Sequence, residues 1–121
     1  MAKSAELKTE AGVKIYGNYI NGEWVESRSH DVIVDLNPAD TSDVIGKFQQ
    51  STKEDTRAAI EAAKAAFPKW RAVPAPERGR VMARVAEIAR QRADELGRIM
   101  TREEGKILRE GKGEILKGVN L

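Results

Sequence analysis

The chain has 121 residues, the size of about one small domain, and its composition already excludes several classes of protein. A hydrophobic fraction of 40% and a charged fraction of 33% fit a soluble, folded chain better than a disordered one. The net charge is only +2 and acids interleave with bases, which argues against a nucleic-acid partner. Because the chain has no cysteine, disulfides, thiolate metal sites and cysteine nucleophiles are excluded within it.

The start of the chain is polar. No stretch approaches the roughly 18 apolar residues of a membrane span, and no apolar stretch of a secretory signal follows the first residues. We therefore expect a cytoplasmic protein with no membrane partner. Residues 1–15 carry only scattered apolar positions, which predicts a flexible tail ahead of a folded part at 16–121.

Short antiparallel strands are expected over about residues 18–48. Asn21-Gly22 lies between short apolar runs, and both residues tolerate the positive φ of a tight hairpin turn. The β-branched run 32–36 predicts another strand, which Asn37-Pro38 ends because proline disfavours helix at the preceding residue. Residues 44–48 predict a further strand.

The remainder, about residues 52–121, predicts three or four helices. The stretch 51–54 matches a capping box, with Ser51 covering a free backbone donor and Glu54 reaching back. Pro68 is expected to end the first helix. The spacings of three and four residues predict one apolar face on this helix, made of Ile60, Ala63, Phe67 and Trp70. We expect the aromatic residues Trp24, Phe67 and Trp70 in the core.

The later helices have their own start and stop signals. Pro76 and Glu77 suit the first turn of a helix, and Gly105 suits the end of one. Asp94 is a candidate N-cap for a segment that ends at Gly105. The final segment, 107–121, is weak alone because each of its glycines costs about 1 kcal/mol relative to alanine. The apolar positions expected to be buried by the middle helix are Val81, Met82, Val85, Ile88 and Ala89.

A search for catalytic residues finds no standard constellation. His30 is the sole histidine and lies in a polar stretch, so we interpret it as solvated. Glu103 and Glu104 are adjacent, and neighbouring side chains on a helix diverge by about 100°, so they are poorly placed to share a substrate. The glycine-lysine pairs at 105–106 and 111–113 lack the further residues of a phosphate-binding loop or dinucleotide fingerprint.

The arginines of residues 78–98 could indicate a basic face for nucleic acid. Acids run among the arginines of residues 78–98, and no aromatic side chains are interleaved for base stacking. A solvated helix surface, turned toward another part of a larger protein, is the better interpretation. Nucleic acid is therefore not an expected partner.

Several stretches, read in order, are similar to the beginning of the aldehyde dehydrogenase superfamily. No single stretch is decisive, but their order and spacing over residues 19 to 121 carry the resemblance. The matching stretches are Tyr19-Ile20-Asn21-Gly22-Glu23-Trp24-Val25, Leu36-Asn37-Pro38-Ala39-Asp40, Val44-Ile45-Gly46, Glu54-Asp55 with Ala58 to Trp70, Pro74 to Arg80, and Met100-Thr101-Arg102-Glu103-Glu104-Gly105-Lys106.

The resemblance implies an α/β fold of which this chain is an incomplete domain, the amino-terminal portion of a coenzyme-binding domain. In that family the attacking cysteine, the general-base glutamate and the dinucleotide-binding strands lie further along the chain. The family chemistry needs a thiolate, a nicotinamide of NAD or NADP, and a base to activate water. No catalytic or cofactor-binding residue is therefore assigned here, and no cofactor is expected to bind this chain alone.

Two minor expectations also follow from the resemblance. Some relatives hold a structural monovalent cation near the position that matches Glu103, helped by backbone close to the Asn37-Pro38 turn. In others the last helix forms part of the wall of the substrate tunnel, which would place Lys117 or Asn120 beside it.

The function that the resemblance implies is oxidation of an aldehyde, possibly a semialdehyde, to its acid once the remaining chain is present. The expected partners are that remaining chain or a full-length relative, in a homo-oligomer. The alternative is a non-catalytic interaction module that binds a full-length relative or another partner. It would be favoured by apolar helix faces that the chain leaves uncovered.

Overall fold

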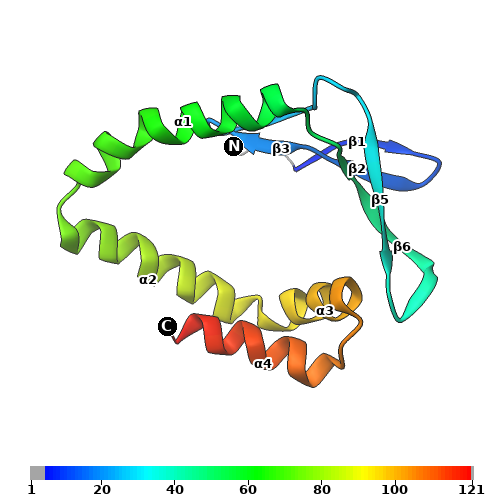
Figure 1. Ribbon diagram of the computed structural model, residues 1–121. Coiled ribbons are helices and arrows are strands. Elements are labelled where there is room, and N and C mark those ends of the chain that lie inside the picture. Colours follow the sequence, from blue (N-terminus) through cyan, green and yellow to red (C-terminus); the bar gives the residue numbers. More distant parts are fainter. Residues whose placement is uncertain (1–4, 121) are drawn as a thin grey trace. The chain divides into compact units, whose positions relative to one another are not determined.

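The computed structural model describes residues 5–120, in which strands come first and helices follow (Figure 1). The chain divides into two compact units. The first unit comprises residues up to 35 together with 44–71, and the second comprises 36–43 together with 72 onward. The strands are β1 (Glu6–Glu10), β2 (Val13–Tyr16), β3 (Asn18–Ile20), β4 (Glu23–Val25), β5 (Val32–Asn37) and β6 (Asp40–Gln49).

Four of the strands form one sheet in the order β1-β2-β6-β5, and β3 and β4 form a separate two-stranded sheet. The β3–β4 hairpin confirms the expected Asn21-Gly22 turn, whose φ angles are 52° and 83°. β2 lies ahead of the region 18–48 and runs parallel to β6, with Ile15 opposite Lys47. The chain between β2 and β6 forms the β3–β4 hairpin and β5, so β6 pairs with β2 through this longer connection and not through a direct turn.

Residues within the expected amino-terminal tail form strand structure. β1 and β2 pair antiparallel across a turn at Ala11 and Gly12, both of which have positive φ. β1 and most of β2 thus lie within the expected tail over 1–15, of which residues 1–4 are outside the described part of the chain. The sequence signal was weak because this hairpin alternates charged and apolar residues over only four or five positions per strand.

The core of the first unit is small and lies around β2. Ile15 is 1% exposed, and the ring of Tyr16 stacks on that of Phe48 with centroids 5.1 Å apart. Gly46 is buried beneath this pair, and an added Cβ there would come within 2.8 Å of the Tyr16 ring. In the other sheet Tyr19 and Trp24 lie 4.9 Å apart across the hairpin.

The first helix, α1 (Lys53–Ala72), corrects two sequence expectations. Pro68 does not end it, and the residues after the proline remain helical although the proline removes one backbone donor. The capping residues are shifted by one position: the Thr52 and Asp55 side chains exchange hydrogen bonds with each other's backbone N–H groups at 3.2 and 2.9 Å. Ser51 instead accepts a hydrogen bond from the Asn18 amide at 2.7 Å.

The second unit holds the other three helices. As expected, Pro76 and Glu77 lie in the first turn of its first helix, whereas Asp94 lies one residue inside a helix and is not its N-cap. Gly105 ends a helix with a φ of 70°, as predicted. No helix within residues 5–120 combines the length and apolar character that a bilayer crossing requires. The helices are α2 (Ala75–Gln91), α3 (Ala93–Glu104) and α4 (Leu108–Val119).

The closest helix packing in the second unit is between α3 and α4, which lie side by side in Figure 1. Gly97 and Gly111 are both buried at this crossing. A Cβ at Gly97 would lie 2.9 Å from the Lys112 Cα, and one at Gly111 would lie 2.8 Å from the Gly97 carbonyl oxygen. The glycines that weaken α4 as an isolated helix therefore include one that permits its packing.

Candidate functional site

A buried polar cluster joins strands and helix in the first unit. Ser27, 1% exposed, donates its backbone N–H to the Gln49 side chain at 2.8 Å and its hydroxyl to Asp55 at 2.8 Å. Asp55, 7% exposed, also accepts hydrogen bonds from the Thr52 N–H and hydroxyl, each at 2.9 Å, and from the Arg28 N–H at 3.2 Å. The hydrogen bonds of Ser27 to Gln49 and to Asp55 therefore join residues that are distant in sequence.

The hydrogen bonds to Asp55 decide its chemistry. The backbone N–H of Thr52, and then the hydroxyls of Ser27 and Thr52, lower the pKa of this carboxyl to about 2. A general base needs a pKa near the working pH, and a carboxylate this acidic whose donors are already engaged does not meet that requirement. The cluster therefore fixes the start of α1 to the strands and does not resemble a catalytic centre.

A second carboxylate, Asp43, ties the tip of the β5–β6 hairpin to α3 within the second unit. The Arg102 guanidinium donates two hydrogen bonds to it, from Nε at 2.9 Å and from Nη2 at 2.6 Å. Asn37 donates a third at 3.2 Å. The Arg102 hydrogen bonds, helped by Asn37, lower the pKa of Asp43 to about 2.

The structure brings two of the family-like stretches together at this point. Asn37 accepts the Ala39 N–H at 3.0 Å and so shapes the Asn-Pro turn. Gly105 faces the same turn, because a Cβ added there would lie 3.0 Å from the Pro38 Cγ. Stretches 36–40 and 100–106, far apart in sequence, thus lie against each other.

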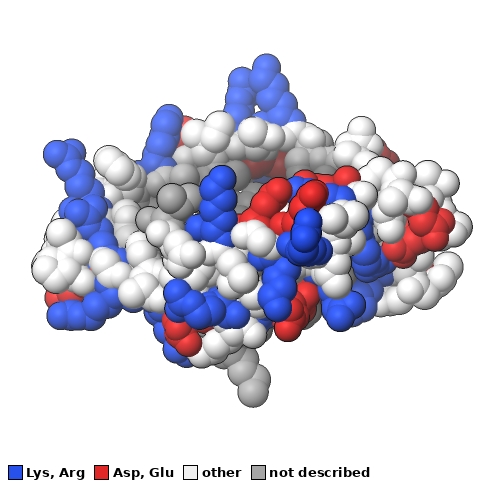
Figure 2. Space-filling model, turned by 90° about the horizontal axis from the view of Figure 1, so that it is seen from below, with Lys and Arg blue, Asp and Glu red and all other residues white. Residues whose placement is uncertain are grey.

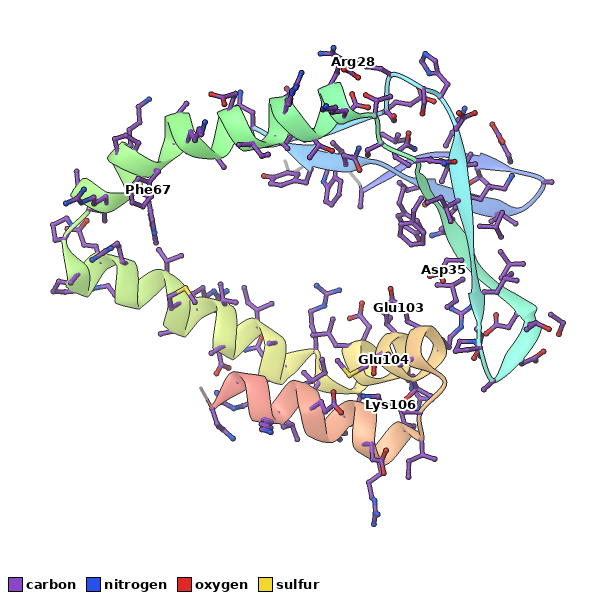
Figure 3. The ribbon with its side chains drawn as sticks, in the orientation of Figure 1. Arg28, Asp35, Phe67, Glu103, Glu104 and Lys106 are labelled. Carbon is purple, nitrogen blue, oxygen red and sulfur yellow. The ribbon has the colours of Figure 1, made fainter. Side chains whose placement is uncertain are left out.

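Glu103, the predicted cation ligand, lies exposed in the last turn of α3 (Figure 3). Its neighbour Glu104 is engaged differently, since its carboxylate lies 2.6 Å from the Lys106 Nζ. Lys106 also contacts Glu114 at 2.7 Å, and the two carboxylates, Glu104 first, raise its pKa. Residues 5–120 contain no group of three or more His, Cys, Asp or Glu that could hold a metal ion. The cation at Glu103 stays a prediction.

Lys117 and Asn120 lie at the carboxyl end of α4 and are exposed, with the Asn120 N–H donating to the Lys117 carbonyl at 3.1 Å. They do not line the groove beside α4, which Ile115, Gly118 and Val119 do. Their place in a substrate tunnel remains a prediction.

The glycine-lysine pairs do not fit the phosphates of a dinucleotide. The Gly105 N–H donates to the Thr101 carbonyl at 2.9 Å, and the Gly111 N–H donates to the Ile107 carbonyl at 3.1 Å. Since both N–H groups already donate hydrogen bonds to backbone carbonyls, they are not free to bind a phosphate. His30 is exposed, as interpreted from the sequence, and its Nδ1 lies 3.7 Å from a Glu26 carboxylate oxygen.

Apolar side chains expected in the core are exposed instead. Phe67, near the end of α1 (Figure 3), is 58% exposed and Trp70 is 43% exposed, whereas Trp24 is half-buried. On α2, Met82 is 61% exposed and Val81, Val85 and Ile88 are also exposed, while Ala89 is half-buried. The helix periodicity was right, but no described part of the chain covers these faces.

Charge is distributed without a single basic patch on the face in Figure 2. Lys and Arg side chains stand among Asp, Glu and uncharged residues there. Basic and acidic side chains pair with each other on these helices, as Arg92 does with Glu95 at 2.6 Å and, between α4 and α3, Lys112 with Asp94 at 2.6 Å. Neither the Asp43–Arg102 pair nor the Ser27–Asp55 hydrogen bond is predicted from the sequence, because only the fold brings the partners together.

Comparison with known proteins identifies what this arrangement resembles. Residues 24–121 match the aldehyde dehydrogenase family. The α-ketoglutarate semialdehyde dehydrogenase of Haloferax volcanii is 44% identical over 82 residues, which is 68% of this chain and 17% of the relative. The malonate-semialdehyde dehydrogenase of Bacillus cereus is 44% identical over 87 residues, 72% of this chain and 18% of the relative.

Solved structures give the same result for the fold. An NAD-dependent aldehyde dehydrogenase from Sinorhizobium meliloti superposes with a TM-score of 0.84 at 29% identity, covering 89% of this chain and 22% of that one. An NADP-dependent enzyme from E. coli has a TM-score of 0.81 at 39% identity, covering 85% and 21%. The chain thus spans about a fifth of the length of the proteins it matches.

Proposed function

The chain belongs to the aldehyde dehydrogenase family, and on that premise we propose that it is the amino-terminal segment of an NAD(P)-dependent dehydrogenase that oxidises an aldehyde to a carboxylic acid. One observation carries the proposal: residues 24–121 match the family while spanning about a fifth of its members. Activity is then a property of the complete polypeptide, in the cytoplasm and as a homo-oligomer.

The segment is proposed to be non-catalytic by itself. It has no cysteine to attack an aldehyde. The hydrogen-bonded carboxylates of Asp43 and Asp55 have pKa values of about 2, too low for a general base at neutral pH. NAD or NADP would be bound by the complete enzyme and not by this segment.

A semialdehyde is the proposed substrate class. The support is that the relatives are dehydrogenases of α-ketoglutarate semialdehyde or malonate semialdehyde. In this scheme the segment contributes to folding and assembly. The Ser27–Asp55 cluster fixes the start of α1, and the Asp43–Arg102 pair fixes the hairpin tip against α3.

The second candidate, a non-catalytic module that binds a full-length relative or another partner, is favoured by one specific observation. α1 and α2 expose apolar residues to water, Phe67 and Met82 among them. Exposed apolar surface of this kind favours binding to a partner. The two candidates differ in what covers these faces: the same polypeptide in the first and a separate one in the second.

The test is the size of the native polypeptide in its source cells, detected with an antibody raised against residues 24–121. A polypeptide several times larger than this chain, which reduces NAD or NADP with a semialdehyde, is the expected result. The isolated chain, at matched concentration, should produce no reduced nicotinamide. A native polypeptide of 121 residues would contradict the dehydrogenase proposal and favour the interaction module.

A further inference from the structure

The turn between β3 and β4 holds a side-chain amide and a backbone N–H that are both unpartnered. Asn21 and Gly22 are exposed, with φ angles of 52° and 83°. Within residues 5–120, neither the Asn21 amide nor the Gly22 N–H has a hydrogen-bond partner. A Cβ added at Gly22 would meet no atom within 4 Å, so nothing crowds the peptide bond that joins the two residues.

These two groups are the reactants for the loss of ammonia from an asparagine side chain. The Gly22 nitrogen, after losing its proton, attacks Cγ of Asn21; the N–Cγ bond forms, the Cγ–Nδ2 bond breaks, and Nδ2 leaves as ammonia. Water then opens the resulting succinimide ring at either of its carbonyls. The product is aspartate, or isoaspartate with the main chain running through the side-chain carbons. Water is the sole co-reactant, and each event adds one carboxylate.

The other asparagines lack this combination. The Asn18 amide is held, because it donates to the Ser51 hydroxyl at 2.7 Å, and the tyrosine that follows it crowds the nitrogen that would attack. Asn37 precedes Pro38, whose nitrogen carries no proton to lose. Asn120 is followed by a residue outside the described part of the chain. Among the asparagines whose surroundings are described on both sides, the reactive arrangement therefore occurs at Asn21.

The hairpin controls whether the ring can close. The attack needs the Gly22 nitrogen to rotate toward the Asn21 Cγ, which the left-handed conformation of the closed turn does not allow. β3 and β4 are three residues long and, among the described strands, pair only with each other. A two-stranded hairpin of this length opens readily. The contact between the Tyr19 and Trp24 rings, 4.9 Å apart, helps to keep it closed.

We propose that Asn21 is a site of spontaneous modification, converted to aspartate and isoaspartate at a rate set by opening of the β3–β4 hairpin. Isoaspartate lengthens the main chain of the turn by one atom, so the two-residue turn cannot re-form with Ile20 opposite Glu23. Chains that have reacted thus keep an added negative charge and a disrupted hairpin. The fraction of reacted chains records how often the hairpin has opened, and it does not depend on the proposed function.

The test incubates the native polypeptide, whatever its length, at mildly alkaline pH in isotopically labelled water. Trypsin in ordinary water then releases residues 15–28, which contain both Asn18 and Asn21, and the label marks carboxylates formed before digestion. Fragmentation in the mass spectrometer should place at least about tenfold more conversion at Asn21 than at Asn18, the internal control. The same peptide incubated alone should convert on the order of tenfold faster than the folded polypeptide, because its turn is always open.

A matched pair of tryptophan substitutions tests the dependence on hairpin opening. Trp24→Ala removes the ring contact across the hairpin and should raise the rate at Asn21 by roughly threefold or more, toward that of the free peptide. Trp70→Ala makes the same change on α1, at a side chain that is 43% exposed, and should leave the rate unchanged. Far-UV circular dichroism checks that both variants stay folded.

The contrary outcomes are equally specific. Conversion at Asn21 no greater than at Asn18 would overturn the site itself. Equal rates in the folded polypeptide and in the free peptide, or in the two tryptophan variants, would overturn the dependence on hairpin opening. If Trp24→Ala does not fold, the comparison of the folded parent with the free peptide decides that dependence, since it needs no variant.

Discussion

Two helix pairs of the second unit differ in how they are completed. α3 and α4 cross on buried glycines, and a Cβ at Gly97 would lie 2.9 Å from the Lys112 Cα. α2 and α4 instead leave a groove whose edge residues Met82 and Val85 are exposed. The α3–α4 contact is packed by residues of this chain alone. The second pair has apolar side chains that no described residue covers.

The largest effect is expected at the finished crossing. Gly97→Ala places a methyl group against backbone that cannot rotate away, and overpacking of this kind costs about 1–3 kcal/mol of unfolding free energy. The gain in helix propensity, about 1 kcal/mol, offsets only part of this cost. Urea unfolding followed by circular dichroism measures the difference.

Gly113→Ala is the matched control, because it lies on α4 with nothing within 4 Å of an added Cβ. It should be stabilised by up to about 1 kcal/mol. If Gly97→Ala were as stable as Gly113→Ala, the crossing would be looser than the structure shows.

The next effect concerns the polar cluster that finishes the first unit. Asp55→Ala leaves the buried Ser27 hydroxyl and the Thr52 N–H without their acceptor, so the midpoint of thermal unfolding should fall by roughly 5 °C or more. The neighbouring Glu54→Ala, at an exposed position, should change it by no more than about 2 °C. A similar midpoint for the two variants would mean that the cluster adds nothing to the fold.

Acid should weaken both units in a defined pH range. Folding lowers the pKa of Asp43 and Asp55 from 3.8 to about 2, so each carboxylate stabilises the folded chain above about pH 4. That stabilisation is lost progressively as the pH falls toward about 2, where the folded chain must also bind protons. Asp43→Asn should unfold a few degrees below the parent at neutral pH, and this gap should close as the pH approaches about 2. A gap that is constant with pH would argue against the Asp43–Arg102 ion pair.

The smallest effect is expected on the unfinished surface. Phe67 is 58% exposed on α1, so Phe67→Ser should change the unfolding free energy of the isolated chain by no more than about 0.5 kcal/mol. The same variant should bind less of a dye that fluoresces on apolar surface. A loss of stability comparable to that of Gly97→Ala would show that α1 is already covered in the isolated chain.

Short-range signals predicted local structure well. Asn21-Gly22 and Gly105 were identified because the positive φ at each is a property of two or three neighbouring residues. The prediction that Pro68 ends the helix is wrong, since the loss of one backbone hydrogen bond costs less than the helical structure on either side contributes. The capping residues differ from the prediction by one position, because the Ser51 hydroxyl accepts a hydrogen bond from Asn18. That contact forms only in the folded unit.

The amino-acid sequence by itself determined the order of strands and helices, the hairpin and helix-end turns, and the family, because these depend on neighbouring residues and on the order of short stretches. The tertiary structure decided the parallel β2–β6 pair, the Asp43–Arg102 and Ser27–Asp55 partners, and which apolar faces are covered. The reason is physical: burial and hydrogen bonding are set by what lies across space, and periodicity shows that a helix has an apolar face without showing what packs against it.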